Sequence, residues 1–277
     1  MSAPPHADPG RGVFETMLVI AGRVVELDAH LGRLSTSVEA LYAGAVPPQA
    51  RTMVLDRAAE IEHGKLRLTV VPPRGRLTAR DSEELAEASG DIALEIEAEE
   101  VDVEAVFPGP DRGAALRSTV VAGGLGEHKW ADRRLLDQAA AAAPGELPLL
   151  LDADGAVLEA SRASVFVVGE DRLLTPSTDG RILPSIARQQ VIEVASAAGI
   201  ATSEERLTLA DLRAREVFLT GSVRGVEPAR MLDGAELAPP GELSGEIAAG
   251  LRHRWRVPAA EPVAAVAAAP PAGRPGR

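Results

Sequence analysis

The chain has 277 residues, which is enough for one large domain or two small ones with a buried core. Hydrophobic residues make up 45% of it and charged residues 25%, as in ordinary soluble globular proteins. The net charge of −12 argues against a nucleic-acid partner, because surfaces that bind nucleic acid neutralise phosphates with lysine and arginine. The absence of cysteine excludes a disulfide scaffold, a thiolate metal site and a cysteine nucleophile.

The N-terminus and the histidines carry two further expectations. The first residues, MSAPPHADPG, lack the apolar core of a signal peptide, and no stretch of about 18 apolar residues follows. We therefore expect a cytoplasmic protein with no membrane-spanning segment. The 5 histidines are scattered, with no pair at the helical spacing of a zinc site, so we expect no bound metal.

The first predicted elements are a short hairpin and a helix. Loose alternation predicts a strand over 13–20, a turn at 21–23 and a second strand over 24–27. Asp28 then suits the N-cap of an amphipathic helix. Three polar residues share one face of this helix at spacings of three and four: His30, Arg33 and Ser37.

A second helix, over about 48–62, leads into a strand over 65–71. Apolar and acidic residues then alternate over 91–106, which is typical of an edge strand with one solvated face.

The second half of the chain begins with the glycine-rich segment 123–126, a candidate boundary between two lobes. Helices are predicted over about 131–143 and 185–198. A hairpin pairs 149–151 with 157–158 around an Asp-Ala-Asp-Gly turn. Further strands are predicted over 164–168, 172–175 and 217–220.

These elements predict an α+β or mixed α/β fold in two lobes. We expect a small N-terminal lobe over 10–122, a linker over 123–128 and a larger lobe over 129–257. The lead 1–9 and the Ala/Pro-rich tail 258–277 are predicted to be disordered.

Lysine is scarce, and this draws attention to two residues. Of 29 basic residues only Lys65 and Lys129 are lysines, and the rest are arginine. Chemistry that needs a deprotonated amine can use lysine but not arginine. Lys129 follows the glycine-rich segment and precedes a predicted helix, where burial in a crevice would lower its pKa. An ordinary surface lysine is the alternative.

Other catalytic patterns are weaker. The glycine-rich segment lacks the spacing of a phosphate-binding loop, which favours a hinge. No Gly-x-Ser-x-Gly sequence is present, although a Ser-His-Asp triad stays open.

Six segments occur in order over roughly residues 10–230: Gly12-Val-Phe-Glu-Thr16, His30-Leu-Gly-Arg-Leu34, Lys129 with its helix, Glu159-Ala-Ser-Arg-Ala-Ser-Val-Phe166, Thr175-Pro176 with Ile182-Leu-Pro-Ser-Ile-Ala-Arg188, and Val217-Phe-Leu-Thr-Gly-Ser222. Together they resemble the class IV aminotransferases, the fold-type IV enzymes that use pyridoxal 5′-phosphate (PLP). The resemblance implies a small N-terminal α/β lobe and a larger lobe with a β-barrel-like sheet and helices.

The resemblance implies roles for individual residues. Lys129 would carry PLP and move the substrate proton, and Glu159 would hold the proton on the pyridine nitrogen. Arg33 would bind the cofactor phosphate, together with the backbone N–H groups of Ile186 and Ala187 at a helix start and the hydroxyl of Ser222 beside Gly221. Ser164 is a further implied cofactor-binding residue. The implied substrate-binding residues are Phe14, Thr16, Arg133 and Arg224. Solvated side chains or core packing are the alternatives for most of them.

Three positions depart from the family pattern. Serine stands at 164 where the family has asparagine, and alanine at 187 where it has threonine. Arg134 stands where many of the aminotransferases have tyrosine. The change at 164 would shorten or remove a hydrogen bond in the expected PLP site, and the change at 187 removes a threonine hydroxyl from it.

Within the family, the runs around Lys129 and Glu159 resemble 4-amino-4-deoxychorismate lyase most. The alternatives are an aminotransferase acting on branched-chain or D-amino acids, and a degenerate homologue without PLP. The resemblance also implies a homodimer with a small-molecule substrate.

Overall fold

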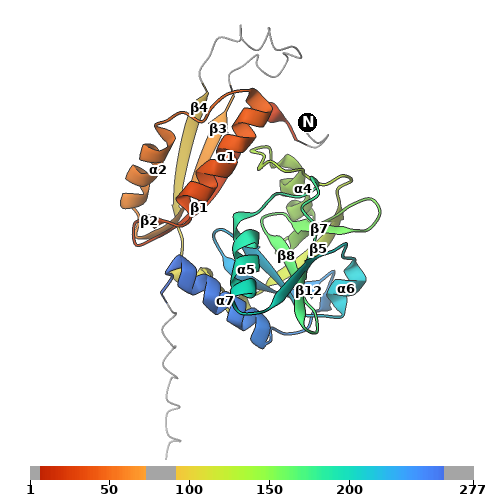
Figure 1. The fold of residues 1–277 in the computed structure, drawn as a ribbon. Coiled ribbons are helices and arrows are strands. Elements are labelled where there is room, and N and C mark those ends of the chain that lie inside the picture. The colour runs from red at the N-terminus through yellow and green to blue at the C-terminus, as the bar shows by residue number, and fades with distance from the viewer. Residues whose placement is uncertain (1–6, 73–91, 259–277) are drawn as a thin grey trace, which may run out of the picture.

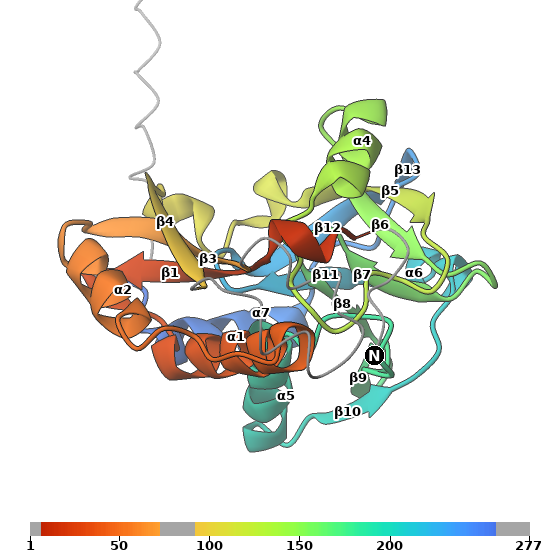
Figure 2. The same ribbon diagram turned by 90° about the horizontal axis from the view of Figure 1, so that it is seen from above.

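The computed structural model describes residues 7–72 and 92–258 (Figure 1). Most of the predicted lead 1–9, nearly all of the predicted tail 258–277 and Asp91 of the predicted edge strand lie outside the described residues. Figures 1 and 2 show a small sheet with its helices on one side of the molecule and a larger sheet on the other.

The small sheet has the order β2-β1-β3-β4, and all its pairs are antiparallel. Its elements, with the helices beside them, are η1 (Pro9–Arg11), β1 (Val13–Ile20), β2 (Arg23–Val24), α1 (Leu27–Tyr42), α2 (Ala50–Ala59), β3 (His63–Val71) and β4 (Ala93–Glu100).

The two faces of β1 have different surroundings, because side chains alternate along a strand. Val13, Met17 and Val19 pack with α1 and α2 in one apolar cluster. Leu18 and Ile20 belong to another cluster, which also contains residues of the helices that pack on the larger sheet. Phe14 and Thr16 therefore share the face of β1 that is turned away from α1.

The larger sheet has the order β10-β9-β8-β11-β12-β5-β6-β7, with β13 beside β12. Its elements are η2 (Val103–Ala105), η3 (Pro110–Arg112), β5 (Ala114–Val120), α4 (Arg134–Ala142), β6 (Leu147–Leu151), β7 (Val157–Ala160), β8 (Ser164–Val168), β9 (Arg172–Thr175), α5 (Ile186–Ala197), β10 (Ala201–Glu204), α6 (Leu209–Arg213), β11 (Val217–Gly221), β12 (Gly225–Leu232), β13 (Ala235–Glu236) and α7 (Glu242–Trp255).

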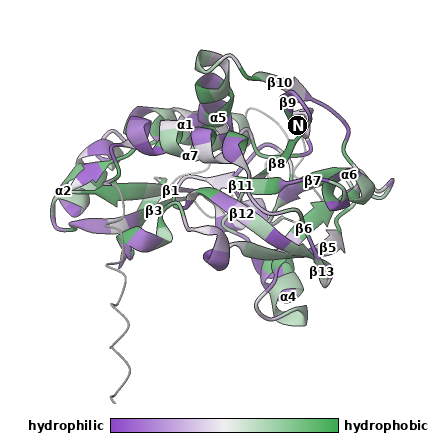
Figure 3. Ribbon diagram, turned by 90° about the horizontal axis from the view of Figure 1, so that it is seen from below, coloured by the Kyte–Doolittle hydropathy of each residue, from purple (hydrophilic) through white to green (hydrophobic). Residues whose placement is uncertain are grey.

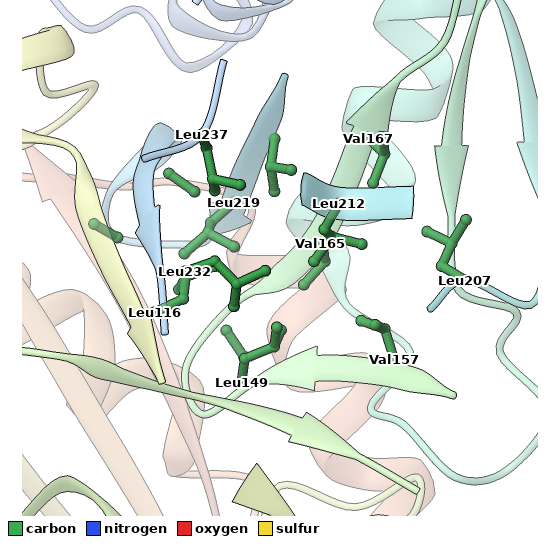
Figure 4. Packing of buried hydrophobic residues seen from close by; sticks show 14 of the residues in the cluster. Leu116, Leu149, Val157, Val165, Val167, Leu207, Leu212, Leu219, Leu232 and Leu237 are labelled. Carbon is green, nitrogen blue, oxygen red and sulfur yellow. The ribbon is translucent and has the colours of Figure 1, made fainter. Parts of the chain in front are cut away.

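This sheet curls so that its end strand β7 meets β8, where Ala160 pairs with Ala163. The curled sheet encloses a core of leucine and valine side chains from β5, β6, β7, β8, β11 and β12 (Figure 4). The two-lobed mixed α/β architecture with a barrel-like sheet, expected from the sequence, is confirmed.

A second core lies outside the barrel, against α5 and α7. Phe166 and Phe218 stack at a centroid distance of 5.1 Å within it. Trp255 of α7 packs there too, and its indole donates a hydrogen bond of 2.7 Å to Gln190 of α5. Helices α1, α5 and α7 carry both hydrophobic and hydrophilic residues, as helices with one buried face do (Figure 3).

Most predicted strands and helices are present with boundaries that differ by a few residues, and β8 and β9 match their predicted ranges. The strand predicted over 91–106 is too long, because β4 ends at Glu100 and η2 follows it. The strand predicted over 24–27 is also wrong beyond Val24, since α1 already begins at Leu27. The N-cap assigned to Asp28 is wrong, because α1 begins at Leu27 after Glu26 in a left-handed conformation. The helix predicted from about 131 begins only at Arg134, since the side chain of Asp132 accepts a hydrogen bond from the Arg134 N–H.

The change from one sheet to the other falls between Glu100 and Ala114, because β5 already pairs within the larger sheet. The division into lobes at 123–128 stays a prediction. Among the residues that the structure describes, we find no helix with the length and apolar character needed to span a bilayer.

Gly123 and Gly124 precede Lys129 and provide a matched test of this loop. Both have positive φ, 75° and 69°. A Cβ on Gly124 would lie 2.1 Å from the carbonyl oxygen of Arg181, whereas one on Gly123 would meet nothing within 4 Å.

We expect Gly124→Ala to lower the free energy of unfolding by roughly 2 kcal/mol more than Gly123→Ala, since only the first adds a clash to the backbone strain. Thermal unfolding of both variants measures the difference. Equal stability of the two would show that the loop moves away from Arg181 at little cost.

Candidate active site

A cavity of about 1030 Å³ lies between the two sheets. Ten of the twelve predicted site residues line it: Phe14, Thr16, Arg33, Lys129, Arg133, Glu159, Ser164, Gly221, Ser222 and Arg224. Ile186 and Ala187 do not, although Ser185 just before them does.

Lys129 is positioned by the backbone. Its carbonyl accepts a hydrogen bond of 2.9 Å from the Phe14 N–H, and the Ala131 N–H donates to Gly12 at 3.0 Å. Trp130 is buried between these contacts and its indole donates to the Leu125 carbonyl at 2.8 Å. The segment 129–131 is therefore fastened to the start of β1.

The Lys129 amine lies 4.8 Å from the centre of the Phe14 ring. Burial, followed by the nearby charge of Arg33, lowers its pKa to about 8. A larger fraction of the amine is thus neutral near pH 7 than for an exposed lysine, as a nucleophile or base requires. Lys129 lies in a cavity, as expected from the sequence, and its reactivity stays a prediction.

Glu159 lies at the end of β7 and is 9% exposed. Burial raises its pKa to about 7, although the backbone N–H of Leu183 and the charge of Lys129 act against that increase. Because the pKa of Glu159 is so close to neutral pH, this carboxylate needs a cationic or proton-donating partner to stay fully ionised in its buried environment.

Arg33 is fixed by a buried carboxylate. Glu15 accepts two hydrogen bonds of 2.7 Å from Arg33 and lies 2.7 Å from Nδ1 of His30. Burial alone would raise the pKa of Glu15, but Arg33 and His30 hold it down at about 2. Nη1 of Arg33 donates to the Pro184 carbonyl at 3.0 Å.

Each terminal nitrogen of Arg33 keeps one N–H for a ligand, because a guanidinium has five N–H groups and three are used. His30 and Arg33, which were predicted to share one face of α1, thus both contact the carboxylate of Glu15. Ser37, the third member of that face, lies 3.0 Å from Nδ1 of His128, another residue of the cavity wall.

Helix α5 begins beside Arg33. Ser185 is its N-cap and accepts a hydrogen bond of 3.2 Å from the Arg188 N–H. The N–H groups of Ile186 and Ala187 fall in the first turn, where helices lack internal acceptors and favour an anion. The Ala187 side chain is buried in the core, so these residues can offer backbone only.

Two buried hydroxyls face each other across β8 and β11. Ser164 and Thr220 are paired in register, and neither hydroxyl has a hydrogen-bond partner. Ser164 lines the cavity next to the turn at Gly221 and Ser222. Buried polar groups without partners are costly, which is the signature of a site for a polar ligand.

Sequence reasoning missed Arg67, which lies on β3 opposite Thr16. Its guanidinium is 4.0 Å from the centre of the Phe14 ring, and its Nε is buried with no partner. Burial lowers the pKa of Arg133; the charge of Asp137 acts against this decrease, and the charge of Arg67 adds to it. Arg133 donates to the Ser161 carbonyl at 2.7 Å.

The chain was compared with known proteins. A sequence profile of the family described as "Amino-transferase class IV" matches residues 12–232. "Branched-chain-amino-acid aminotransferase-like protein 2" of Arabidopsis thaliana is 27% identical over 245 residues, 81% of this chain and 42% of that protein. The branched-chain-amino-acid aminotransferase of Salmonella typhimurium is 32% identical over 90 residues, 32% of this chain and 29% of that protein. The matched regions thus span less than half the length of these curated relatives.

Among solved structures, a 4-amino-4-deoxychorismate lyase from Pseudomonas aeruginosa superposes with a TM-score of 0.70 at 24% identity, over 91% of this chain and 95% of the other. A hypothetical aminotransferase from Mycobacterium tuberculosis, in its PLP-bound form, gives 0.70 at 22% identity, over 91% and 94%. These structures share the fold. Because the family profile covers most of the chain, the protein belongs to the class IV aminotransferase family.

Proposed function

We propose that the protein is a PLP-dependent 4-amino-4-deoxychorismate lyase, which eliminates pyruvate and forms 4-aminobenzoate. The observation that carries this proposal is a set of arginines in the cavity wall. Besides Arg33, four arginines line the cavity: Arg67, Arg133, Arg162 and Arg224. Acidic residues line it too, but Arg67 and Arg133 form no salt bridge with them among the described residues, and Arg162 and Arg224 share the single carboxylate of Glu227. A substrate with two carboxylates matches such a cavity better than a branched-chain amino acid, which has one carboxylate and an apolar side chain.

The residues present fit PLP. When bound, its protonated pyridine ring supplies an electron sink for the carbon attached to the reacting nitrogen. Arg33, the turn at Gly221 and Ser222, and the start of α5 would hold its phosphate. Glu159 would pair with the ring nitrogen, and that pairing would keep this buried carboxylate ionised.

Substrate would bind between the small sheet and the turn of β11. Arg133 and Arg67 form no salt bridge among the described residues, and the guanidinium of Arg67 lies over the ring of Phe14. Thr16 of β1 is paired with Arg67 of β3, so both lie on the same face of the small sheet. Arg224, in the β11–β12 turn, lines another part of the cavity. These groups would fix the orientation of a flat, doubly charged ring.

Lys129 would then act as the base. Its neutral amine takes the proton from the ring carbon that bears nitrogen, and the enolpyruvyl oxygen leaves with the electrons of its bond to the ring. The ring becomes aromatic, and the enol takes up a proton to give pyruvate. The reaction therefore needs no second amino acceptor.

A second candidate is an aminotransferase acting on branched-chain or D-amino acids. The names of the curated relatives favour the branched-chain form. A third is a degenerate homologue that binds no PLP, which colourless purified protein would reveal. We also propose that the protein acts as a homodimer in the cytoplasm.

The lyase and aminotransferase proposals predict different products. With 4-amino-4-deoxychorismate and no keto acid, we expect release of 4-aminobenzoate and pyruvate in equal amounts. Fluorescence measures the 4-aminobenzoate, and a coupled lactate dehydrogenase assay measures the pyruvate. Rapid glutamate formation from valine or D-alanine with 2-oxoglutarate, with no 4-aminobenzoate in the first assay, would instead identify an aminotransferase.

The lowered pKa of Lys129 predicts its pH-dependent reactivity. An amine reacts when deprotonated, so modification of the PLP-free protein by trinitrobenzenesulfonate at Lys129 should rise with a midpoint near pH 8. Peptide mapping separates Lys129 from Lys65, the second lysine of the chain. A midpoint near the ordinary lysine value of about 10.4 would contradict the proposed environment.

Glu159→Gln should lower kcat by about 10²-fold or more, because the amide keeps the size but not the charge that pairs with the ring nitrogen. PLP should stay bound, since the phosphate contacts are elsewhere. Borohydride reduction and peptide mapping should still find the cofactor on Lys129. An unchanged kcat would mean that another acid pairs with the ring.

A further inference from the structure

Two of the cavity arginines share one buried carboxylate. Nη2 of Arg162 lies 3.0 Å from Oε2 of Glu227, and Nη2 of Arg224 lies 3.0 Å from Oε1. The side chain of Glu227 is 4% exposed, whereas those of Arg162 and Arg224 are 40% and 30% exposed. All three residues line the cavity, and the two guanidinium groups are far more exposed than the carboxylate that they share.

The arginines come from two different turns that lie against each other. Arg162 is in the turn between β7 and β8, which the Ala160–Ala163 pair closes. Arg224 is in the turn between β11 and β12. A Cβ on Gly221 would lie 3.0 Å from the carbonyl oxygen of Arg162, so the absence of a side chain allows this approach.

The turn that carries Arg224 is held in place. The carbonyl of Arg224 accepts a hydrogen bond of 2.9 Å from the Phe107 N–H. Gly225, with φ of 61°, lies where a Cβ would come 2.4 Å from the Phe107 ring. Backbone contacts thus fix the main chain of Arg224, and Glu227 fixes its guanidinium group.

The pair keeps unused hydrogen-bonding capacity. Each arginine contacts Glu227 through Nη2 alone, so the other nitrogens of each guanidinium stay available. Nε of Arg224 is buried with no acceptor, and neither arginine has a second acidic partner among the described residues. Two cations on one anion leave one positive charge unbalanced within this cluster of three residues.

We propose that Arg162 and Arg224 form a clamp for one carboxylate of the substrate and that Glu227 is the positioning residue of this clamp. A ligand carboxylate supplies the acceptor that Nε of Arg224 lacks and balances the excess charge. Arg67 and Arg133 bind the second carboxylate. The protein thereby selects dianionic substrates over monocarboxylates of the same length. This inference rests on the proposed function only for the identity of the substrate.

The test measures ligand binding to the PLP-loaded protein by calorimetry, with saturated dicarboxylates of four to six carbons and the monocarboxylates of equal length as probes. We expect at least one dicarboxylate to bind tenfold more tightly than its monocarboxylate partner. Arg162→Gln and Arg224→Gln should each reduce that preference to within about twofold. Arg172→Gln, at an exposed arginine on β9 outside the cavity, is the matched control and should retain it.

Glu227→Gln separates positioning from charge. Neutralising Glu227 adds net positive charge to the cavity, so charge alone predicts tighter dicarboxylate binding. Positioning predicts the loss of the preference, because the arginines no longer share an ionised anchor. Tighter binding would overturn the role of Glu227, and unchanged melting temperature and PLP absorbance exclude misfolding as the cause of a loss.

A wild-type protein without the preference, or variants at 162 and 224 that keep it, would overturn the clamp. Because the probes do not react, the result is independent of the lyase assay. If no 4-aminobenzoate forms but the preference exists and is lost in the variants, the proposed function fails and the clamp stands. If 4-aminobenzoate forms and the preference persists in the variants, the reverse holds.

Discussion

The two backbone hydrogen bonds between the segment 129–131 and the start of β1 are the constraint on which the site depends. They join Lys129 and Ala131, in the loop after β5, to the start of the first strand of the chain. The Lys129 amine lies beside Phe14 at the cavity, where burial lowers its pKa. The two sheets are thus joined at the point where the proposed chemistry takes place.

Alternation along β1 explains how one strand serves two purposes. Phe14 and Thr16 face the cavity, whereas Glu15 points to α1 and meets His30 and Arg33 there. Because a buried carboxylate between these partners stays ionised, it can hold the Arg33 guanidinium in one orientation. Arg33 reaches the cavity from the helix layer and bonds to Pro184 of the larger unit.

The elements that could be predicted are those with strong local patterns. β8 and β9 are short apolar runs between turn residues, and their ranges were predicted correctly. Helix α7 was missed because Gly245 and Gly250 interrupt its pattern. The structure explains one of these glycines, since a Cβ on Gly250 would lie 2.5 Å from Val194 of α5.

The site residues show the same limit. Lys129 stood out because lysine is scarce in this chain, whereas Arg67 and Arg162 are single arginines among many. Alternation alone could have placed Arg67 on a face of β3, but not opposite Thr16, because the sequence does not determine strand register. The pairing of Arg162 with Glu227 joins two distant turns, and no local pattern indicates it.

Fold cannot decide between elimination and transamination, because structures named for either activity share it with this chain. The distinction must come from the cavity wall. Glu15 pairs with Arg33, and Glu227 pairs with both Arg162 and Arg224, so these last two arginines share one negative charge. Arg67 and Arg133 form no salt bridge among the described residues. A substrate with two carboxylates can accept hydrogen bonds from both pairs of arginines. An apolar amino acid has one carboxylate and would leave one pair without an acceptor, and for this reason we favour the dianionic substrate.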